Sequence, residues 1–452
     1  MWSRRAVTGL GIGGAVAAAA PLAAAPAGGG RQAEALALMA FAESTHPRGR
    51  EAAADEAWRS GWKTLAGSAD QLDDGAYFIG LLTAMRWFRD GHTTVLPFEF
   101  VGGVPARLNA GPFGLSAPLR VRAFDDGVWV TAGGPGGLLG ARIRLVNGVS
   151  DAEIMRRVEA AWPAGNAAWP HRWAGQAFAS PGLLQGLGVA TQPEQPIRYV
   201  AEATAGAAIA VDLSPRRGAV GDLSKLERRP CDYETWAAEA KGGNFLRPLA
   251  NGALYLSLDE MADTPGRAFL ELTRDVVEAL KAPEAQRLVV DLRRNGGGDN
   301  FLGEALRKHV ERSRFNRPGG LYVLTSPRTF SAAQNLANRL ERETYAVFIG
   351  GPTGGAPNHY GDAKRWVGPA SGVTAMVSTL PWFDSYPSDK RGWIMPDVPV
   401  ADRFADWLAG RDPVLEAALA HRGGADNDLT RDRVFYAERA SQAAPWRVFW
   451  RG

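Results

Sequence analysis

The sequence is poor in cysteine and histidine. Its 452 residues include one cysteine, Cys231, and six histidines. A single cysteine excludes an intrachain disulfide. No cysteine or histidine cluster has the spacing of a metal site. We therefore expect neither a metal nor a cofactor.

An excess of charge of one sign is also missing. The chain has 51 Lys and Arg residues against 48 Asp and Glu residues, a formal net charge of +3, and it has no basic run. A nucleic-acid partner is therefore not indicated. Long apolar stretches are absent after the first residues, so we expect no stable membrane span in the mature chain.

Residues 1–27 have the layout of a signal peptide. Arg4 and Arg5 precede a Gly- and Ala-rich apolar stretch, and Ala-x-Ala sites lie between Ala23 and Ala27. This layout predicts a twin-arginine signal and a periplasmic or secreted protein. An ordinary secretory signal or an uncleaved anchor is the alternative.

The remaining chain is long enough for two or three domains. Apolar periodicity predicts an N-terminal helical region over residues 31–97. Mostly strands are expected over residues 98–215, where Asp125-Asp126-Gly127 signals a hairpin and the order of elements resembles a PDZ-like module. Strands that alternate with helices over residues 216–422 predict an α/β catalytic domain. The tail, residues 423–452, is unassigned.

The stretch from Leu288 to Leu340 holds the best candidate nucleophile. An apolar run ends in Gly296-Gly297-Gly298, and Ser331 lies where a second strand gives way to a helical pattern. A serine there can project its hydroxyl beside free backbone N–H groups, which we assign to Gly297 and Ala332, with Gly298 as the alternative. A plain helix cap is the other interpretation of Ser331.

Three segments carry a resemblance to a known family. Residues 291–298 (DLRRNGGG), 329–340 (TFSAAQNLANRL) and 350–358 (GGPTGGAPN) resemble, in order, the motifs of the tail-specific, or C-terminal-processing, serine peptidases. The branch that the chain looks most like contains the tricorn core and interphotoreceptor retinoid-binding protein. The resemblance implies a crotonase/Clp-like ββα spiral for the α/β catalytic domain.

The resemblance also implies a histidine base. His92 lies in a segment similar to the family's D-x-H-T, although Gly91 stands where tricorn has a serine. The lysine of the Ser-Lys branch is absent, since Ala356 occupies its position. His359 and then Lys364 are the weaker candidates for the base.

The same resemblance supplies an acid and a substrate wall. Asp389 fits the relay acid of the family best, and Asp384 is the runner-up. The turn that follows Gly350 is expected to line the substrate site, through Thr353, Gly354, Gly355, Asn358 and His359.

We therefore expect an exported serine hydrolase, most simply a peptidase that acts on a peptide or protein substrate. Ser331 would be the nucleophile and His92 the base, oriented by Asp389 directly or through an intermediate polar group. Two alternatives stay open: a binding protein that keeps the fold without the chemistry, and a hydrolase of small esters or amides.

Overall fold

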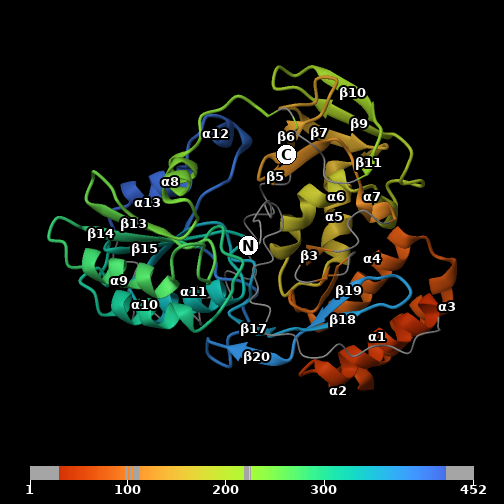
Figure 1. Cartoon of the computed structure of the whole chain (residues 1–452), viewed down its shortest axis with the longest axis horizontal. Coiled ribbons are helices and arrows are strands. Elements are labelled where there is room, and N and C mark those ends of the chain that lie inside the picture. Colours follow the sequence, from red (N-terminus) through yellow and green to blue (C-terminus); the bar gives the residue numbers. More distant parts are fainter. Residues whose placement is uncertain are drawn as a thin grey trace.

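The computed structural model describes residues 30–96, 100–101, 104–105, 111–217, 223 and 225–423. The predicted signal peptide, residues 1–27, lies outside the described residues, as does the tail beyond residue 423. Figure 1 shows two bodies side by side, one built mainly from the first half of the chain and the other mainly from the second half.

The chain opens with helices that pack through aromatic side chains. Asp55 and Asp73 each cap a helix, because their carboxylates accept hydrogen bonds from the N–H groups of Trp58 (3.1 Å) and Ala76 (2.7 Å). Trp58 stands edge-on to Trp62 in the core. The elements are α1 (Arg31–Thr45), α2 (Gly49–Ala54), α3 (Glu56–Ser68), η1 (Ala69–Gln71), α4 (Asp74–Met85) and η2 (Arg86–Phe88). No helix in the described ranges is long and apolar enough to cross a membrane.

An antiparallel sheet follows these helices. Its main strands run in the order β10-β9-β7-β6-β5, and the predicted hairpin at Asp125-Asp126-Gly127 is confirmed, since Phe124 pairs with Gly127. The strands are β5 (Leu119–Phe124), β6 (Gly127–Gly133), β7 (Arg142–Val146), β8 (Val149–Ser150), β9 (Ile197–Glu202) and β10 (Ala208–Leu213). The associated helices are α5 (Asp151–Ala161), η4 (Trp169–Trp173), α6 (Ala174–Ala179) and α7 (Pro181–Gly186). The PDZ-like description of this region stays a prediction.

The second body is built on a six-stranded sheet with helices on both faces. Its order is β12-β13-β14-β15-β16-β21, antiparallel only between β12 and β13. The strands are β12 (Phe245–Pro248), β13 (Ala253–Ser257), β14 (Arg287–Asp291), β15 (Leu321–Thr325), β16 (Val347–Gly350) and β21 (Val398–Pro399). The helices are α8 (Asp232–Ala240), α9 (Phe269–Ala279), α10 (Leu302–Glu311), α11 (Ala332–Glu343), α12 (Phe404–Leu408) and α13 (Pro413–Ala420).

Alternate residues of these strands enter two separate cores. Val290 and Val323 join the core with α9, α10 and α11, whereas Val289 and Leu324 join the core with α13. This period of two, in strands buried on both faces, explains why the sequence shows continuous apolar runs there. The mixed α/β class is confirmed, and the ββα-spiral description stays a prediction.

A late segment of the chain crosses to the first body. Strand β1 (Thr94–Leu96) pairs with β19 (Thr374–Val377), which pairs in turn with β18 (Lys364–Val367). Trp366 belongs to the core of the N-terminal helices. Beside them, β17 (Asn358–Gly361) pairs with β20 (Leu380–Phe383). The pairing of β1 ties the loop that precedes it, residues 89–93, to the second half of the chain. The remaining short elements are β2 (Phe100–Val101), β3 (Val104–Pro105), η3 (Pro112–Gly114), β4 (Leu115–Ser116) and β11 (Arg216–Arg217).

Candidate active site

Ser331 lies between β15 and α11, as the sequence predicts. It caps α11 with φ 56° and ψ −127°, a backbone conformation that residues with a Cβ atom rarely adopt. The loop before it is fixed by Thr329, whose hydroxyl donates to the Leu292 carbonyl (2.9 Å) and accepts from the Ser326 N–H (3.1 Å). Ser331 is therefore held at a sharp turn that opens a helix.

The glycine turn forms a wall against this serine. A Cβ atom added to Gly297 would lie 2.5 Å from Ser331 Cβ and 3.0 Å from its Oγ, so only glycine permits this approach. The Gly297 N–H donates to Asn295 Oδ1 (2.9 Å), and Asn295 Nδ2 donates to the Leu258 carbonyl (2.9 Å). Asn295 therefore fixes the turn and occupies the N–H group that we expected to face the substrate.

Two other N–H groups of the predicted oxyanion hole are unoccupied. Within the described residues, the N–H groups of Ala332 and Gly298 make no hydrogen bond. Ala332 is the first residue of α11, where N–H groups have no partner within the helix and the helix dipole is positive. The structure thus makes Ala332 and Gly298, not Gly297, the available donors.

The side chains of residues 291–294 hold the end of β14 from behind. Arg293 binds Asp291 and Asp412 at 2.7 Å each, and Arg294 binds Asp291 at 2.7 Å and Asp259 at 3.0 Å. Burial opposes ionisation of Asp291, but the two guanidinium groups outweigh it and hold the pKa of this carboxyl below its usual range. The charged residues of the DLRR segment are thus positioning groups for the glycine turn.

His92 has a carboxylate partner from its own loop. Asp90 Oδ1 lies 3.6 Å from His92 Nδ1 and accepts a hydrogen bond from the His92 N–H (3.0 Å). Because Nδ1 faces Asp90, the other ring nitrogen, Nε2, is left for a substrate or nucleophile. Sequence reasoning included Asp90 in the D-x-H-T segment but gave it no role.

Asp90 is buried in a cluster of polar side chains. Its Oδ2 accepts hydrogen bonds from Thr93 Oγ1 (2.6 Å) and Ser378 Oγ (2.5 Å), and His46 Nε2 lies 3.7 Å away. Burial alone would raise the pKa of Asp90, yet the nearby imidazoles of His46 and His92 and the hydrogen bond from Ser378 hold it well below its ordinary value. The cluster therefore keeps Asp90 ionised beneath the imidazole of His92.

Aromatic rings hold His92 close to the serine loop. Its ring stacks on Phe330, the residue before Ser331, at a centroid distance of 4.3 Å, and Phe330 stacks on Trp169 at 3.7 Å. Neither ring nitrogen of His92 has a hydrogen-bond partner among the described residues, so the hydrogen bond to Ser331 is not formed. The His92 loop and the serine loop therefore pack against each other through Phe330, but His92 and Ser331 are not joined by a hydrogen bond.

The same packing accounts for Gly91. A Cβ atom at this position would lie 2.9 Å from Trp169 Nε1 and 3.0 Å from Phe330 Cζ. A serine side chain at this position would meet the same two rings. Ser378 and Thr93 supply the polar contacts of the cluster instead.

His359, the weaker candidate for the base, is buried parallel to His92. The ring centroids are 5.6 Å apart, and His359 Nδ1 donates to the Ala356 carbonyl (3.0 Å). Burial, with a further contribution from the charge of His92, lowers the pKa of His359 to about 4, so this ring is neutral. Lys364, the third candidate, is exposed on β18.

The predicted contact between Asp389 and His92 is not found among the described residues. Asp389 accepts hydrogen bonds from Ser385 Oγ (2.6 Å) and from the Arg391 guanidinium (2.8 Å). Arg391 also binds both carboxylate oxygens of Glu341 at 2.7 Å. The runner-up, Asp384, binds Arg339 at 2.7 Å. Each of these carboxylates is bound by a guanidinium, and Asp90 is the carboxylate that lies beside the His92 ring.

The turn after β16 is bound to the serine loop by its own backbone. The N–H groups of Gly354 and Gly355 donate to the Thr329 carbonyl at 3.0 and 3.3 Å. The Thr353 hydroxyl donates to the Gly355 carbonyl (2.9 Å), and Asn358 Nδ2 donates to the Tyr386 carbonyl (2.7 Å). These groups, which we expected to line the substrate site, hold loops in place in this structure.

The described residues contain no group of three or more His, Cys, Asp or Glu side chains that could hold a metal ion. Ser331, His92 and the first residues of α11 bring a hydroxyl, an imidazole and backbone donors to one place. Of the predicted residues, Ser331, His92 and the glycine turn come together, and Asp389 does not join them.

No family model matches the chain. Tricorn protease homolog 2 of Streptomyces coelicolor is 24% identical over 244 residues, which are 47% of this chain and 19% of the homolog, so the match spans about a fifth of that protein.

The fold is shared with solved structures. Mature CPAF superposes with a TM-score of 0.57 at 12% identity over 86% of this chain and 96% of CPAF. Mature CPAF complexed with lactacystin gives a TM-score of 0.54 at 12% identity over 86% of this chain and 98% of CPAF. Identity this low shows the fold alone. Together, the sequence match and the fold confirm that this chain is similar to the tail-specific serine peptidases.

Proposed function

We propose that the chain is an exported serine peptidase with Ser331 as its nucleophile and His92 as its base. One observation carries the proposal. Ser331 has a strained backbone at a helix start, its Oγ faces the glycine turn, and its neighbour Phe330 holds the imidazole of His92. A helix cap alone does not need a strained serine.

In this mechanism the Ser331 hydroxyl attacks the carbonyl carbon of the scissile peptide bond. Its proton passes to Nε2 of His92, and Asp90 holds the Nδ1–H tautomer and balances the charge of the imidazolium. The departing amine takes that proton and leaves an ester on Ser331, which water then hydrolyses with His92 again as the base. The N–H groups of Ala332 and Gly298 would hold the oxyanion, and loss of one such donor typically slows turnover about a hundredfold or more.

A serine-directed fluorophosphonate tests the nucleophile. We expect the wild-type chain to be labelled, and Ser331→Ala to lose the label. Ser44→Ala is the matched control, because Ser44 lies on α1 and only donates to the Phe41 carbonyl, so this variant should keep the label. Equal labelling of wild type and Ser331→Ala would contradict the assignment.

Two observations favour the second candidate, a binding protein without the chemistry. The hydrogen bond between His92 and Ser331 is not formed, and Asn295 occupies the Gly297 N–H. Catalytic hydrogen bonds are often loose until substrate binds, so we place this candidate second. Absence of label on the folded wild-type chain would favour it. Cleavage of a peptide library, against hydrolysis of small esters, separates a peptidase from an esterase.

Export is a further part of the proposal. Arg4 and Arg5, with the Ala-x-Ala sites after them, support twin-arginine export to the periplasm or beyond. Replacement of both arginines by lysine should leave the protein inside the cell, as fractionation would show. Arrival of the double variant in the periplasm would contradict the twin-arginine route.

A further inference from the structure

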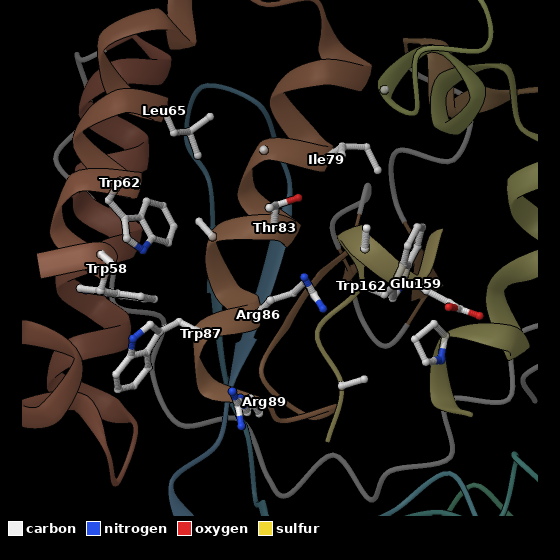
Figure 2. A pocket seen from close by; sticks show the side chains of 18 of the residues that line it. Trp58, Trp62, Leu65, Ile79, Thr83, Arg86, Trp87, Arg89, Glu159 and Trp162 are labelled. Atoms are coloured by element: carbon white, nitrogen blue, oxygen red, sulfur yellow. The ribbon is translucent and has the colours of Figure 1, made fainter. Parts of the chain in front are cut away.

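A large groove opens in the first body, beside the loop that carries His92. It has a volume of about 1240 Å³ and extends across α4, from α3 on one side to α5 and the segment after it on the other (Figure 2). The half-buried apolar residues along it include Ile79, Ala84 and Trp87. The volume exceeds that of typical small-molecule sites, so several residues of an extended peptide fit in it.

The groove carries an excess of positive charge. Three arginines line it (Arg86, Arg89 and Arg156) against one acid, Glu159. The charge of Arg156 is balanced by Glu153, and Glu159 accepts a hydrogen bond from His171 Nε2 (2.9 Å). Figure 2 shows Arg86 pointing across the groove toward Trp162 and Arg89 at its lower end.

Arg86 and Arg89 are the two cations without a balancing charge. Both are exposed, and in the part of the chain that the structure describes neither guanidinium has a hydrogen bond or an ion pair. A guanidinium is a rigid fork of donors that matches a carboxylate, and nearby apolar walls strengthen such a pair. The chemistry complementary to this groove is therefore a carboxylate next to apolar side chains.

The groove leads to the candidate active site. Arg89 immediately precedes Asp90 in the His92 loop. On the opposite wall, Asn166 Nδ2 donates to the carbonyls of Gly354 (2.9 Å) and Gly392 (2.6 Å). A Cβ atom on Gly165 would lie 3.3 Å from the Arg89 carbonyl oxygen. The end of the groove is thus built from segments that contact the histidine loop and the turn after β16.

We propose that this groove binds an acidic, apolar segment of the substrate, with its side-chain carboxylates on Arg86 and Arg89. The proposal rests on the proposed function only in that the bound peptide is a substrate. It gives the peptidase a preference for chains in which glutamate or aspartate alternates with aromatic or aliphatic residues, at a distance from the bond that is cut.

Binding can be measured without turnover in the Ser331→Ala chain. The probe is a fluorescein-labelled, C-terminally amidated peptide of alternating Glu and Leu, followed by anisotropy. We expect Arg86→Gln with Arg89→Gln to weaken binding about tenfold or more, because two charge-assisted pairs are lost. Arg274→Gln is the matched control: Arg274 is exposed on α9 in the other body, and this variant should bind like the parent.

A second peptide, with Gln in place of Glu, should bind about as weakly as the Glu peptide binds to the double variant. Equal affinity of the Glu and Gln peptides would overturn the proposal, and so would equal affinity of the parent and the double variant. If the Gln peptide binds only with a free C-terminus, the groove recognises the terminal carboxylate, and the assignment of side-chain carboxylates to Arg86 and Arg89 is wrong. Fluorophosphonate labelling of the wild-type chain tests the nucleophile independently, so a failure of the groove and a failure of the proposed function are distinguishable.

Discussion

Asp90 and Asp389 are equally buried carboxylates with different surroundings. Each is 3% exposed. Asp90 is met by two hydroxyls and two imidazoles, whereas Asp389 is met by a hydroxyl and a guanidinium that also binds Glu341. A carboxylate that is saturated by arginine has little capacity to orient a histidine. The hydrogen-bond partners of a buried carboxylate, and not its burial, therefore decide whether it can orient a catalytic histidine.

The largest effect is expected from Asp90→Asn, which tests whether Asp90 orients His92. We expect kcat to fall about a thousandfold or more, because an amide does not select the Nδ1–H tautomer or balance the imidazolium. Steady-state peptide hydrolysis measures the effect, and circular dichroism checks that the fold survives. A fall of less than tenfold, with the same fold, would mean that another acid orients His92.

The matching change is Asp389→Asn. We expect the free energy of unfolding to drop by about 3 kcal/mol, because a buried ion pair with Arg391 is broken while Arg391 keeps only Glu341. Urea denaturation measures this loss. At a temperature where the variant is folded, its kcat should stay within tenfold of the wild-type value. A loss of turnover as large as that of Asp90→Asn would restore Asp389 as the relay acid.

His359, which is buried next to the His92 ring, makes the free energy of unfolding depend on pH. Its pKa is lowered from 6.5 to about 4 in the folded chain, chiefly by burial. The unfolded chain then binds a proton at pH values where the folded chain does not, so stability falls as pH drops from about 6.5 to about 4. The loss is about 3 kcal/mol over this window.

This pH dependence can be isolated with His359→Gln. Denaturant unfolding at pH 7 and at pH 4.5 should show a smaller loss of stability in the variant than in the wild-type chain. The same loss in both would mean that His359 is not the group that titrates.

The smallest expected effect is that of Gly91→Ala. The added methyl group meets Trp169 and Phe330, so we expect about 2 kcal/mol of destabilisation from overpacking. Gly61→Ala is the matched control, since nothing lies within 4 Å of a Cβ atom there and alanine favours the helix α3. Thermal unfolding should move in opposite directions for the two variants. An unchanged melting temperature of Gly91→Ala would show that Trp169 and Phe330 can shift to make room for the methyl group.

The elements around the serine could be predicted because their signals are local. The helices expected within residues 31–97 are present as α1 to α4 with η1 and η2, and the strand and helix on either side of Ser331 are present as β15 and α11. Apolar periodicity and glycine clusters act within a few residues. The approach of the glycine turn to Ser331 has another cause: the two segments follow the ends of β14 and β15, which are parallel neighbours in the sheet.

The choice between Asp90 and Asp389 as the partner of His92 could not be predicted from local signals. His92 and Ser331 are far apart in the sequence, and nothing local shows that Phe330 and Trp169 hold the His92 ring. Arg391, two residues after Asp389, was a signal that this acid had a partner. Asn295 was equally visible inside the DLRRN segment, but its role depends on the Leu258 carbonyl of a neighbouring strand end.

The left-handed backbone of Ser331 has a thermodynamic consequence. Glycine adopts φ 56° without penalty, whereas a side chain there costs about 1–3 kcal/mol. Ser331→Gly should therefore make the chain more stable than the wild type, and Ser331→Ala should not, because alanine keeps the Cβ atom. A position at which the natural residue is worse for folding than its simplest replacement is kept for something other than folding. Comparison of the melting temperatures of these two variants would thus show, without any substrate, whether Ser331 is unfavourable for folding.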